Sequence, residues 1–294
     1  MRLLTTLYDL NQMTALSSFV DGFCFGNDKF GTRLTKSFSI EEIIQAIQIS
    51  KSLNKATFLY ANQMFTDDQL IQFEFFLKQL PISDLTGIVV ADIGGYRTVA
   101  NLGYSQKVVY NPETLLTNFY DFNFLEKFGI QGAYIAKEIT LEDLLVIAKQ
   151  KKYKLFMVGH GHLNMFYSKR QLIDNFTQFN GQDHSYNQRQ DLRIIEENRQ
   201  DQSYPILEDQ AGTHVFRSEV FSSLNDLDML ETWVDFLVVD TIFKNDEYAQ
   251  KVLPLYRKKN IDQNVIADVQ NQYKETWDEG FFHKKTIYMT KDKS

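Results

Sequence analysis

Polar side chains directly follow a series of short apolar runs in this sequence, and their types suit acid–base and ligand-binding chemistry. The residues at these positions are Asp9, Asn27, Asn62, Asp92, Asn111, Lys137 with Glu138, His160 with His162, and Asp240. Asn and Asp at such positions also cap the following helix, so a structural role is the alternative for each. If the positions converge, carboxylate, imidazole, amide and ammonium groups would share one basin in which protons could be moved.

The densest of these positions lies in the segment 154–170, which reads KLFMVGHGHLNMFYSKR. His160 stands between two glycines, which would permit the backbone to approach a ligand closely. An imidazole there predicts a general base or a metal ligand, and a structural, hydrogen-bonded histidine is the alternative. His160 and His162 are two residues apart, which is not the spacing of a zinc-binding HExxH helix.

Acidic and further polar residues complete the predicted site. We expect Asp92, Glu138 and Asp240 to act with His160 in catalysis, and a divalent metal held by such groups is left open. No residue is individually assigned as a metal ligand, and the cofactor is left unknown. The residues predicted to bind substrate, several of which can donate hydrogen bonds to anionic groups, are Arg33, Asn62, Lys137, Tyr167, Ser168 and Arg170. Ser168 lacks the GxSxG context of a hydrolase nucleophile.

Eight short apolar runs are the elements that would position these side chains. They span residues 3–8, 22–25, 57–60, 87–91, 107–110, 132–136, 154–158 and 235–239. Most are apolar on successive residues, as strands covered on both faces are. Capping-box patterns at 39–42, 66–69 and 140–143 predict helix starts between them. Strands that alternate with helices predict parallel pairing with right-handed crossovers.

Eight strand–helix units favour an α/β fold of the (β/α)8 TIM-barrel type over an open sheet. The seventh and eighth runs start about 80 residues apart, so we predict an inserted β-rich segment after strand seven, at about 180–225. Within it, 204–207 and 214–216 are expected to pair as strands across the turn at 209–212. We therefore expect a single barrel domain over 1–294, with the insertion covering the C-terminal mouth.

Composition excludes several classes of protein. The chain has 294 residues, of which 44% are hydrophobic and 23% charged, with 14 Gly, 4 Pro and one cysteine. These values exclude disordered, collagen-like and disulfide-stapled proteins. One cysteine, Cys24, cannot by itself hold an iron–sulfur cluster, so no cluster is expected in this chain. The sequence lacks a secretory signal pattern and an apolar run of about 20 residues, which predicts a cytoplasmic protein without a membrane partner.

The charge is distributed unevenly. The net charge of −7 disfavours general attraction to nucleic acid, yet residues 146–200 carry nine Lys or Arg against five Asp or Glu. A basic island between two acidic flanks could contact a phosphate backbone, and a solvated surface is the alternative.

Several segments, in order along most of the chain, resemble peptidase family U32, the collagenase-like proteins. The main one is Gly159-His160-Gly161-x-Leu163-x-x-x-Tyr167-Ser168-x-Arg170. The others are FGTR at 30–33, LYAN at 59–62, VVADIG at 89–94, KEITL at 137–141, VDFL at 234–237 and KNDEY at 244–248. The resemblance implies a TIM barrel. It also implies either a peptidase of unassigned catalytic type or a role in hydroxylation of RNA bases or a quinone ring, including prephenate-dependent hydroxylation of tRNA wobble uridine.

This chain departs from the family pattern where chemistry would be expected. Some members hold an iron–sulfur cluster through four cysteines, and Asn164 and Gln171 stand where the family motif has cysteines. Lys169 replaces a glycine, Phe156 replaces a glutamate, and VVDTI at 238–242 keeps only the acid of the family's KIEGR. The resemblance therefore implies a shorter, divergent member that works with a fuller, cluster-bearing paralogue.

Three functions are left as hypotheses. The first is a component of a tRNA-base hydroxylation system, with the cluster-bearing paralogue and tRNA as candidate partners. The second is a peptidase that uses His160 and nearby carboxylates. The third is a non-catalytic partner protein, with aromatic residues at 281–283 and in the insertion expected to be exposed contacts.

Overall fold

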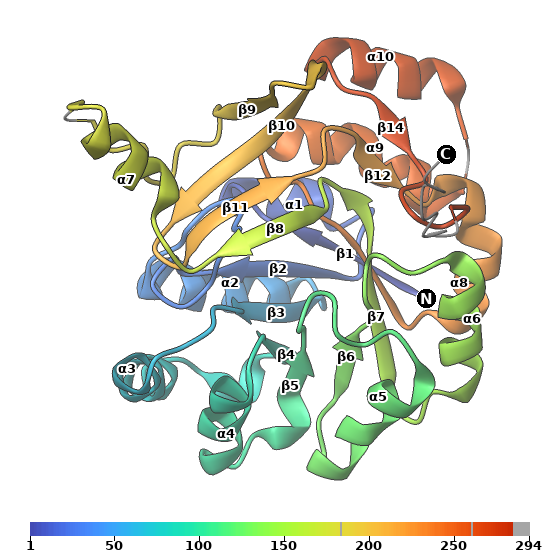
Figure 1. Cartoon of the computed structure of the whole chain (residues 1–294). Helices are drawn as coiled ribbons and strands as arrows, with labels where there is room; N and C mark the ends of the chain where they lie inside the picture. Colours follow the sequence, from blue (N-terminus) through green and yellow to red (C-terminus); the bar gives the residue numbers. More distant parts are fainter. Residues whose placement is uncertain (183, 260, 285–294) are drawn as a thin grey trace, which may run out of the picture.

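The computed structural model describes residues 1–182, 184–259 and 261–284, and its centre is a closed barrel of parallel strands (Figure 1). The barrel strands are β1 Arg2–Thr6, β2 Gly22–Gly26, β3 Ala56–Ala61, β4 Gly87–Val90, β5 Val108–Tyr110, β6 Gly132–Tyr134, β7 Lys154–Gly161 and β13 Phe236–Val239. β13 closes the ring by pairing in parallel with both β1 and β7. The predicted (β/α)8 barrel is confirmed, and each predicted apolar run overlaps one of these strands.

Helices cover the outside of the ring. They are α1 Met13–Leu16, α2 Ile40–Ser52, α3 Asp67–Lys78, α4 Ile93–Asn101, α5 Phe119–Phe124, α6 Leu141–Gln150, α8 Leu227–Trp233, α9 Asp246–Lys258 and α10 Gln263–Tyr273. The predicted starts are confirmed: Ser39 and Thr66 form two-way capping boxes, and the Thr140 side chain accepts a hydrogen bond from the Asp143 amide. These caps satisfy amides that a helix start leaves without a partner and so fix where each helix begins.

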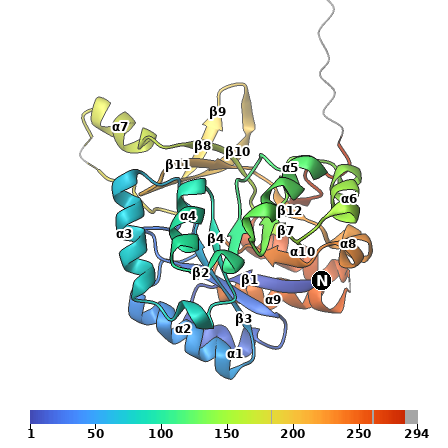
Figure 2. The same cartoon turned by 90° about the horizontal axis from the view of Figure 1, so that it is seen from below.

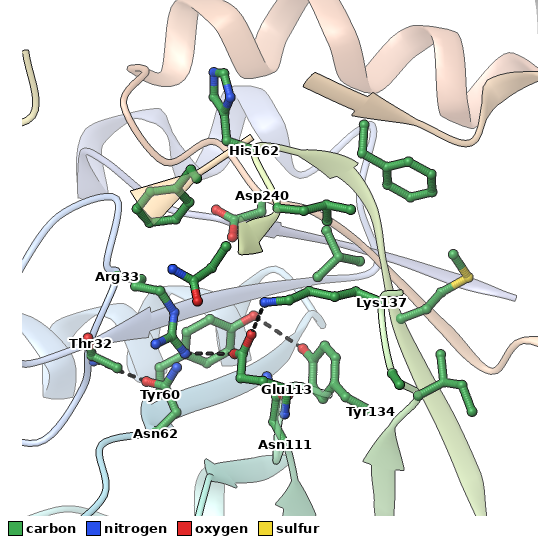
Figure 3. Close-up of a pocket in the computed structure, with 18 of the residues that line it drawn as sticks. Thr32, Arg33, Tyr60, Asn62, Asn111, Glu113, Tyr134, Lys137, His162 and Asp240 are labelled. Carbon is green, nitrogen blue, oxygen red and sulfur yellow. Dashed lines mark hydrogen bonds and ion pairs between the residues drawn. The ribbon is translucent and has the colours of Figure 1, made fainter. Parts of the chain in front are cut away.

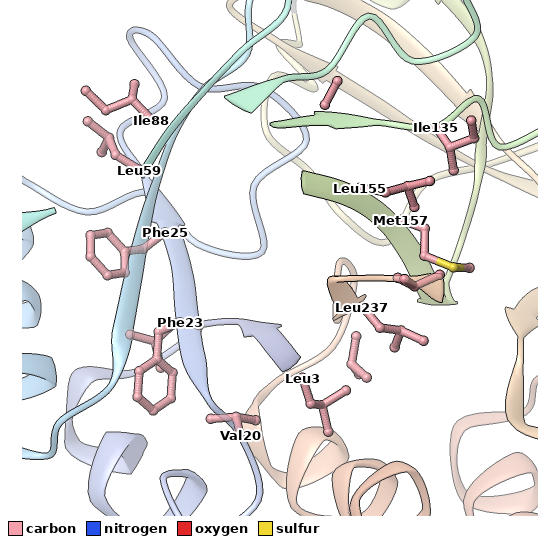
Figure 4. Packing of buried hydrophobic residues seen from close by; sticks show 14 of the residues in the cluster. Leu3, Val20, Phe23, Phe25, Leu59, Ile88, Ile135, Leu155, Met157 and Leu237 are labelled. Atoms are coloured by element: carbon pink, nitrogen blue, oxygen red, sulfur yellow. The ribbon is translucent and has the colours of Figure 1, made fainter. Parts of the chain in front are cut away.

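Alternation along the barrel strands divides the core into two layers. On β2, Phe23 packs in the layer between the strands and the helices, which Figure 4 shows, whereas Cys24 belongs to the cluster inside the barrel. Three phenylalanines pack together in this interior cluster: Phe156 stacks on Phe236 with centroids 4.3 Å apart, and the Phe58 ring packs edge-on against both. Since these rings plug the interior, a ligand site has to lie at the mouth of the barrel.

A second, four-stranded antiparallel sheet lies over the mouth (Figure 2). In spatial order its strands are β8 Asn164–Ser168, β11 Gly212–Phe216, β10 Arg199–Asp209 and β9 Arg193–Glu196, and α7 Leu172–Phe179 follows β8. The predicted hairpin is confirmed, with Leu207 opposite His214. This β-rich segment begins at Asn164, ahead of the expected boundary near 180. Beside β7, the short strands β12 Val220–Ser222 and β14 Trp277–Asp278 extend the barrel sheet.

The basic island predicted from residues 146–200 does not form one surface. Lys149, Lys151, Lys152 and Lys154 lie at the end of α6 and the start of β7, which is the end of the barrel opposite the mouth. Two of them, Lys151 and Lys154, pair with Asp235. β7 runs the length of the barrel between these lysines and the basic residues that follow it, so the two groups lie apart in space. Within the described ranges, no helix is long and apolar enough to cross a membrane.

Candidate functional site

A pocket opens at the C-terminal mouth of the barrel, beneath the second sheet (Figure 3). Its space, including the opening to solvent, is about 790 Å³. The polar side chains that line it follow or end six barrel strands: Thr32, Arg33, Tyr60, Asn62, Asn111, Glu113, Tyr134, Lys137, His162 and Asp240. They meet because the parallel strands of a closed barrel direct their C-terminal loops to one end.

Glu113 is the centre of charge in this pocket. Its Oε1 accepts a hydrogen bond from Arg33 Nη2 at 2.6 Å, and its Oε2 pairs with Lys137 Nζ. Burial alone would raise the pKa of Glu113, but the two cations outweigh burial and lower that pKa to about 2. Glu113 is therefore an anion held between two cations, and the three side chains together carry one net positive charge.

The backbone is strained at two members of this cluster. Arg33 has φ of 55° and Glu113 has φ of 66°, a left-handed region that costs a residue with a side chain about 1 kcal/mol or more. Asn111 Oδ1 accepts a hydrogen bond from the Glu113 amide at 3.2 Å, and Asp209 accepts one from the Arg33 amide at 3.1 Å. Backbone strain held in place by such contacts is typical of functional sites.

Asp240 can exchange a proton in this pocket, and two tyrosine hydroxyls can donate hydrogen bonds. Burial raises the pKa of Asp240 to about 6, against the opposing effects of the Ile242 amide, which donates to Oδ1 at 3.0 Å, and of Arg33. A carboxyl group with such a pKa can take and return a proton near neutral pH. The Tyr60 and Tyr134 hydroxyls lie 3.2 Å apart, and burial raises the pKa of both, so they stay protonated and can donate hydrogen bonds.

His160 does not reach this pocket. Its ring is fully buried, with Nε2 2.6 Å from the Tyr248 hydroxyl and Nδ1 3.2 Å from the Tyr256 hydroxyl, both on α9. Trp277 packs edge-on against it at 4.7 Å between centroids. Burial lowers the pKa of His160 to about 3, so the ring is neutral. The sequence predicts a catalytic histidine at this position. In the structure, the His160 side chain instead links β7 to α9 through the two tyrosine hydroxyls.

The glycines beside His160 allow β7 to pack closely against β13, and they do not form a ligand site. A Cβ at Gly159 would lie 2.3 Å from Leu237, and one at Gly161, where φ is +131°, would lie 2.4 Å from the Asp240 carbonyl oxygen. Both contacts are with β13 or the residue that follows it. The Asp240 amide donates to the His160 carbonyl at 2.8 Å. This segment therefore acts on the pocket through the backbone, by holding Asp240 at the mouth.

His162 and Phe282 also line the pocket. His162 Nδ1 donates to the Arg217 carbonyl at 2.9 Å, and burial lowers the pKa of the ring to about 4, so Nε2 carries no proton at neutral pH. Phe282, expected to be an exposed contact for a partner, is instead buried and packs edge-on against Phe221 at 5.1 Å. The C-terminal part of the described chain thus closes one side of the pocket.

The remaining predicted site residues divide into two groups. Four of them line the pocket: Arg33, Asn62, Lys137 and Asp240. Tyr167 lies beside it, in the wall of a neighbouring cavity. Those outside it, besides His160, are Asp92, Glu138, Ser168 and Arg170. Asp92 caps α4, because its carboxylate accepts hydrogen bonds from the amides of Gly95 at 2.6 Å and Phe65 at 2.7 Å. Glu138 and Arg170 are exposed.

Sequence reasoning missed the residues that join the second sheet to the mouth. Thr32 Oγ1 donates to Asp209 Oδ2 at 2.6 Å and lies 3.0 Å from His214 Nε2. Asp209 and His214 flank the predicted hairpin turn, and nothing local to that turn relates them to a threonine 177 residues away. Glu113 was also missed, although it comes two residues after Asn111, a position that the pattern of strand ends singled out.

The chain offers no ready metal site in the part that the structure describes. Among those residues, no group of three or more His, Cys, Asp or Glu could hold a metal ion. Cys24 is buried inside the barrel, and burial raises the pKa of its thiol to about 12. The divalent metal left open by the sequence therefore lacks a preformed ligand set within these residues. The ionisable groups of the pocket are therefore Asp240, with its raised pKa, and the ion cluster of Arg33, Glu113 and Lys137.

Comparison with known proteins gives the relationships of the chain. A family model described as peptidase family U32 matches residues 10–292. tRNA hydroxylation protein P2 of Bacillus subtilis (strain 168) is 25% identical over 286 residues, which cover 90% of this chain and 92% of that protein. tRNA hydroxylation protein P1 of the same bacterium is 22% identical over 156 residues, or 53% of this chain and 37% of P1. A U32 peptidase of known structure shares the fold, with a TM-score of 0.52 at 14% identity, and the match covers 81% of this chain and 92% of that one.

Proposed function

This chain belongs to peptidase family U32, and from that membership we propose that it is a component of a tRNA-base hydroxylation system that modifies the wobble uridine. The observation that carries the proposal is the similarity to tRNA hydroxylation protein P2 over 90% of this chain and 92% of P2. Similarity of that extent spans most of both chains, so it is not confined to a shared fragment.

We infer that a second, larger family member supplies the redox chemistry. Hydroxylation adds an oxygen atom to the base and therefore needs an oxidant and a route for electrons. The single cysteine of this chain cannot hold an iron–sulfur cluster by itself. The match to P1 covers 37% of P1, so such a relative has chain beyond the matched part that could carry a cluster. The proposed partner is a cluster-bearing paralogue of this kind.

The pocket would then supply binding and proton exchange. Arg33 and Lys137 can donate hydrogen bonds to an anionic group of a substrate or co-substrate, and protonation of Asp240 would leave one net positive charge among these two cations, Glu113 and Asp240. Asp240, with a pKa of about 6, is the group suited to remove or return a proton near neutral pH. These roles use residues of this chain and leave electron transfer to the partner.

Deletion of the gene tests the proposal. We expect tRNA from the deletion strain to lack the hydroxylated wobble uridine, measured by mass spectrometry of digested tRNA, and the wild-type gene to restore it. Asp240→Asn should fail to restore it, whereas Asp228→Asn, a matched change at a side chain that is 94% exposed, should succeed. Unchanged modification in the deletion strain would overturn the proposal, and rescue by Asp240→Asn would remove Asp240 from the mechanism.

The peptidase hypothesis has less support from the geometry. It relied on His160 as an acid–base group or metal ligand, and that ring lies outside the pocket between two tyrosine hydroxyls. A gelatin-cleavage assay with wild type and His160→Ala is expected to show no cleavage that depends on His160.

A further inference from the structure

We propose that a second chamber, beside the pocket described above, binds a single unstacked RNA nucleotide with its base against Tyr167. The inference rests on the proposed function and deepens it by locating the base. The chamber has about 690 Å³ of space including its opening. Both apolar and amide side chains line it, among them Asn62, Gln63, Met64, Pro112, Met165 and Tyr167.

The two chambers share a charged wall. Arg33, Glu113 and Lys137 line both of them. A planar ligand in the second chamber would therefore lie beside these three charged side chains, next to the pocket that contains Asp240. This arrangement allows one chamber to hold the base while the other holds the groups that act on it.

Tyr167 is a fixed aromatic platform. One side of its ring stacks on His214, with centroids 4.8 Å apart and planes at 12°, and its hydroxyl donates to the Ala211 carbonyl at 2.9 Å. His214 is itself buried and lies within hydrogen-bond distance of Thr32 and Asp209. The orientation of Tyr167 is thus set before a ligand binds. Proteins hold unstacked RNA bases on aromatic rings of this kind.

The other walls fit a pyrimidine. Met64 and Met165 are 48% and 43% exposed, and thioether side chains pack well against flat rings. Asn62 lines the chamber, and its Oδ1 accepts a hydrogen bond from the Thr32 amide at 3.1 Å, which leaves its amide nitrogen available as a donor. Within the described ranges that nitrogen has no hydrogen-bond partner, and it can donate to a carbonyl oxygen at the edge of a base.

Lys169 and Arg170 are the cations that we expect to meet the phosphate of such a nucleotide. Lys169 Nζ donates to the Met64 carbonyl at 2.9 Å, which holds an ammonium group at the rim of the chamber, and Arg170 follows it with an exposed side chain. The four lysines around the start of β7 are at the opposite end of the barrel. We therefore expect RNA contact at one nucleotide and its neighbouring phosphate, without these four lysines.

Binding of RNA hairpins to the purified full chain tests this site. The probes are a hairpin with a uridine in its loop and the same hairpin with an abasic residue at that position, measured by fluorescence anisotropy. Wild type should bind the uridine hairpin at least about fivefold more tightly, as expected for one stacked base. Tyr167→Phe should keep this preference and Tyr167→Leu should lose it.

Further variants separate the site from a folding defect. Met165→Glu, at a side chain that is 43% exposed, should weaken uridine binding about tenfold by repelling the phosphate. Lys169→Met should weaken binding of both hairpins about threefold, whereas Lys152→Met, a matched loss of charge at the far end of the barrel, should not. Wild-type binding that does not distinguish the two hairpins, or Tyr167→Leu and Met165→Glu proteins that bind like wild type, would overturn the proposal.

The outcomes also distinguish this inference from the proposed function. If deletion abolishes hydroxylation but the Tyr167 and Met165 variants bind normally, the nucleotide site is wrong and the function stands. If binding depends on these residues but deletion leaves the modification unchanged, the site stands and the function is wrong.

Discussion

The two carboxylates of the pocket have opposite electrostatic environments. Glu113 lies between Arg33 and Lys137 with a pKa lowered to about 2, so its charge does not change near neutral pH. Asp240 has a pKa raised to about 6 by burial. Neighbouring carboxyl groups whose pKa values are pushed apart are a known basis for dividing roles, one group holding charge and the other moving protons.

Asp240→Asn is expected to stabilise the fold at neutral pH even though it removes function. The folded pKa of about 6 lies above the roughly 3.9 of an unfolded aspartate. Folding therefore disfavours the ionised form, and the stability of the wild type falls as pH rises from about 4 through about 6. The variant cannot ionise, so its free energy of unfolding should exceed that of the wild type by about 1–2 kcal/mol near pH 7.

Urea unfolding of both proteins at about pH 7 and about pH 4 measures this difference, which should vanish at the lower pH. A variant less stable than the wild type near neutral pH would show that Asp240 is a stabilising residue instead. Gained stability together with lost activity is the pattern of a residue kept for function.

At the scale of elements, one β-bulge decides where the histidine of the family motif points. β7 and β13 pair Val158 with Val238 and then His160 with Val239, so Gly159 is an extra residue in β7. Regular alternation would put His160 on the same side as Phe156 and Val158, facing the barrel interior. The extra residue reverses the side, and His160 packs under α9.

His160→Ala is expected to lower stability and leave the chemistry intact. The change opens a cavity and leaves the Tyr248 and Tyr256 hydroxyls without the ring, which costs about 2–4 kcal/mol. The folded pKa of about 3 lies below the roughly 6.5 of an unfolded histidine, so the wild type loses stability as pH falls from about 6.5 toward 3. The variant should lack this part of the acid sensitivity.

Urea unfolding at about pH 7 and pH 5, together with tRNA analysis at a temperature where the variant is folded, checks both parts. Unchanged stability with lost hydroxylation would return His160 to the catalytic role that the sequence predicts.

The elements could be predicted from the sequence because each has a local signal. Apolar runs mark the strands, capping boxes mark α2, α3 and α6, and turn residues mark the hairpin of β10 and β11. The site was predicted less well, since its geometry depends on non-local features. The bulge at Gly159 redirects His160, the left-handed turn at Glu113 brings a carboxylate back over the mouth, and the pairing of Asp209 and His214 with Thr32 joins segments far apart in the chain.

At the scale of the whole molecule, the segment over the mouth leaves the barrel and returns to it at one place. The Arg217 amide donates to the Leu163 carbonyl at 2.9 Å, and Asn164 stands opposite Phe216. The segment also contacts the mouth of the barrel through hydrogen bonds from Thr32 and Arg33 to the Asp209 carboxylate. This arrangement favours the expected description of one barrel domain with an insertion, which an excision can test.

Replacement of residues 165–215 by an Asn-Gly turn is expected to leave a folded barrel. Such a turn joins adjacent antiparallel residues with little strain, and the barrel strands keep their partners. The shortened chain should retain helical circular dichroism and unfold cooperatively in urea, at lower stability than the full chain, and should not restore tRNA hydroxylation. A shortened chain that is unfolded would mean that the segment is an integral part of the domain.

The ring of strands is sealed between β1 and β13, where Thr5 and Val239 are paired 234 residues apart in sequence. During synthesis on the ribosome, the first strand emerges long before the partner that covers its outer edge. An uncovered strand edge can recruit strands of other nascent chains. The ring can therefore close only after β13, in the final quarter of the chain, has been translated, and until then the open edge of β1 has to be shielded from other chains.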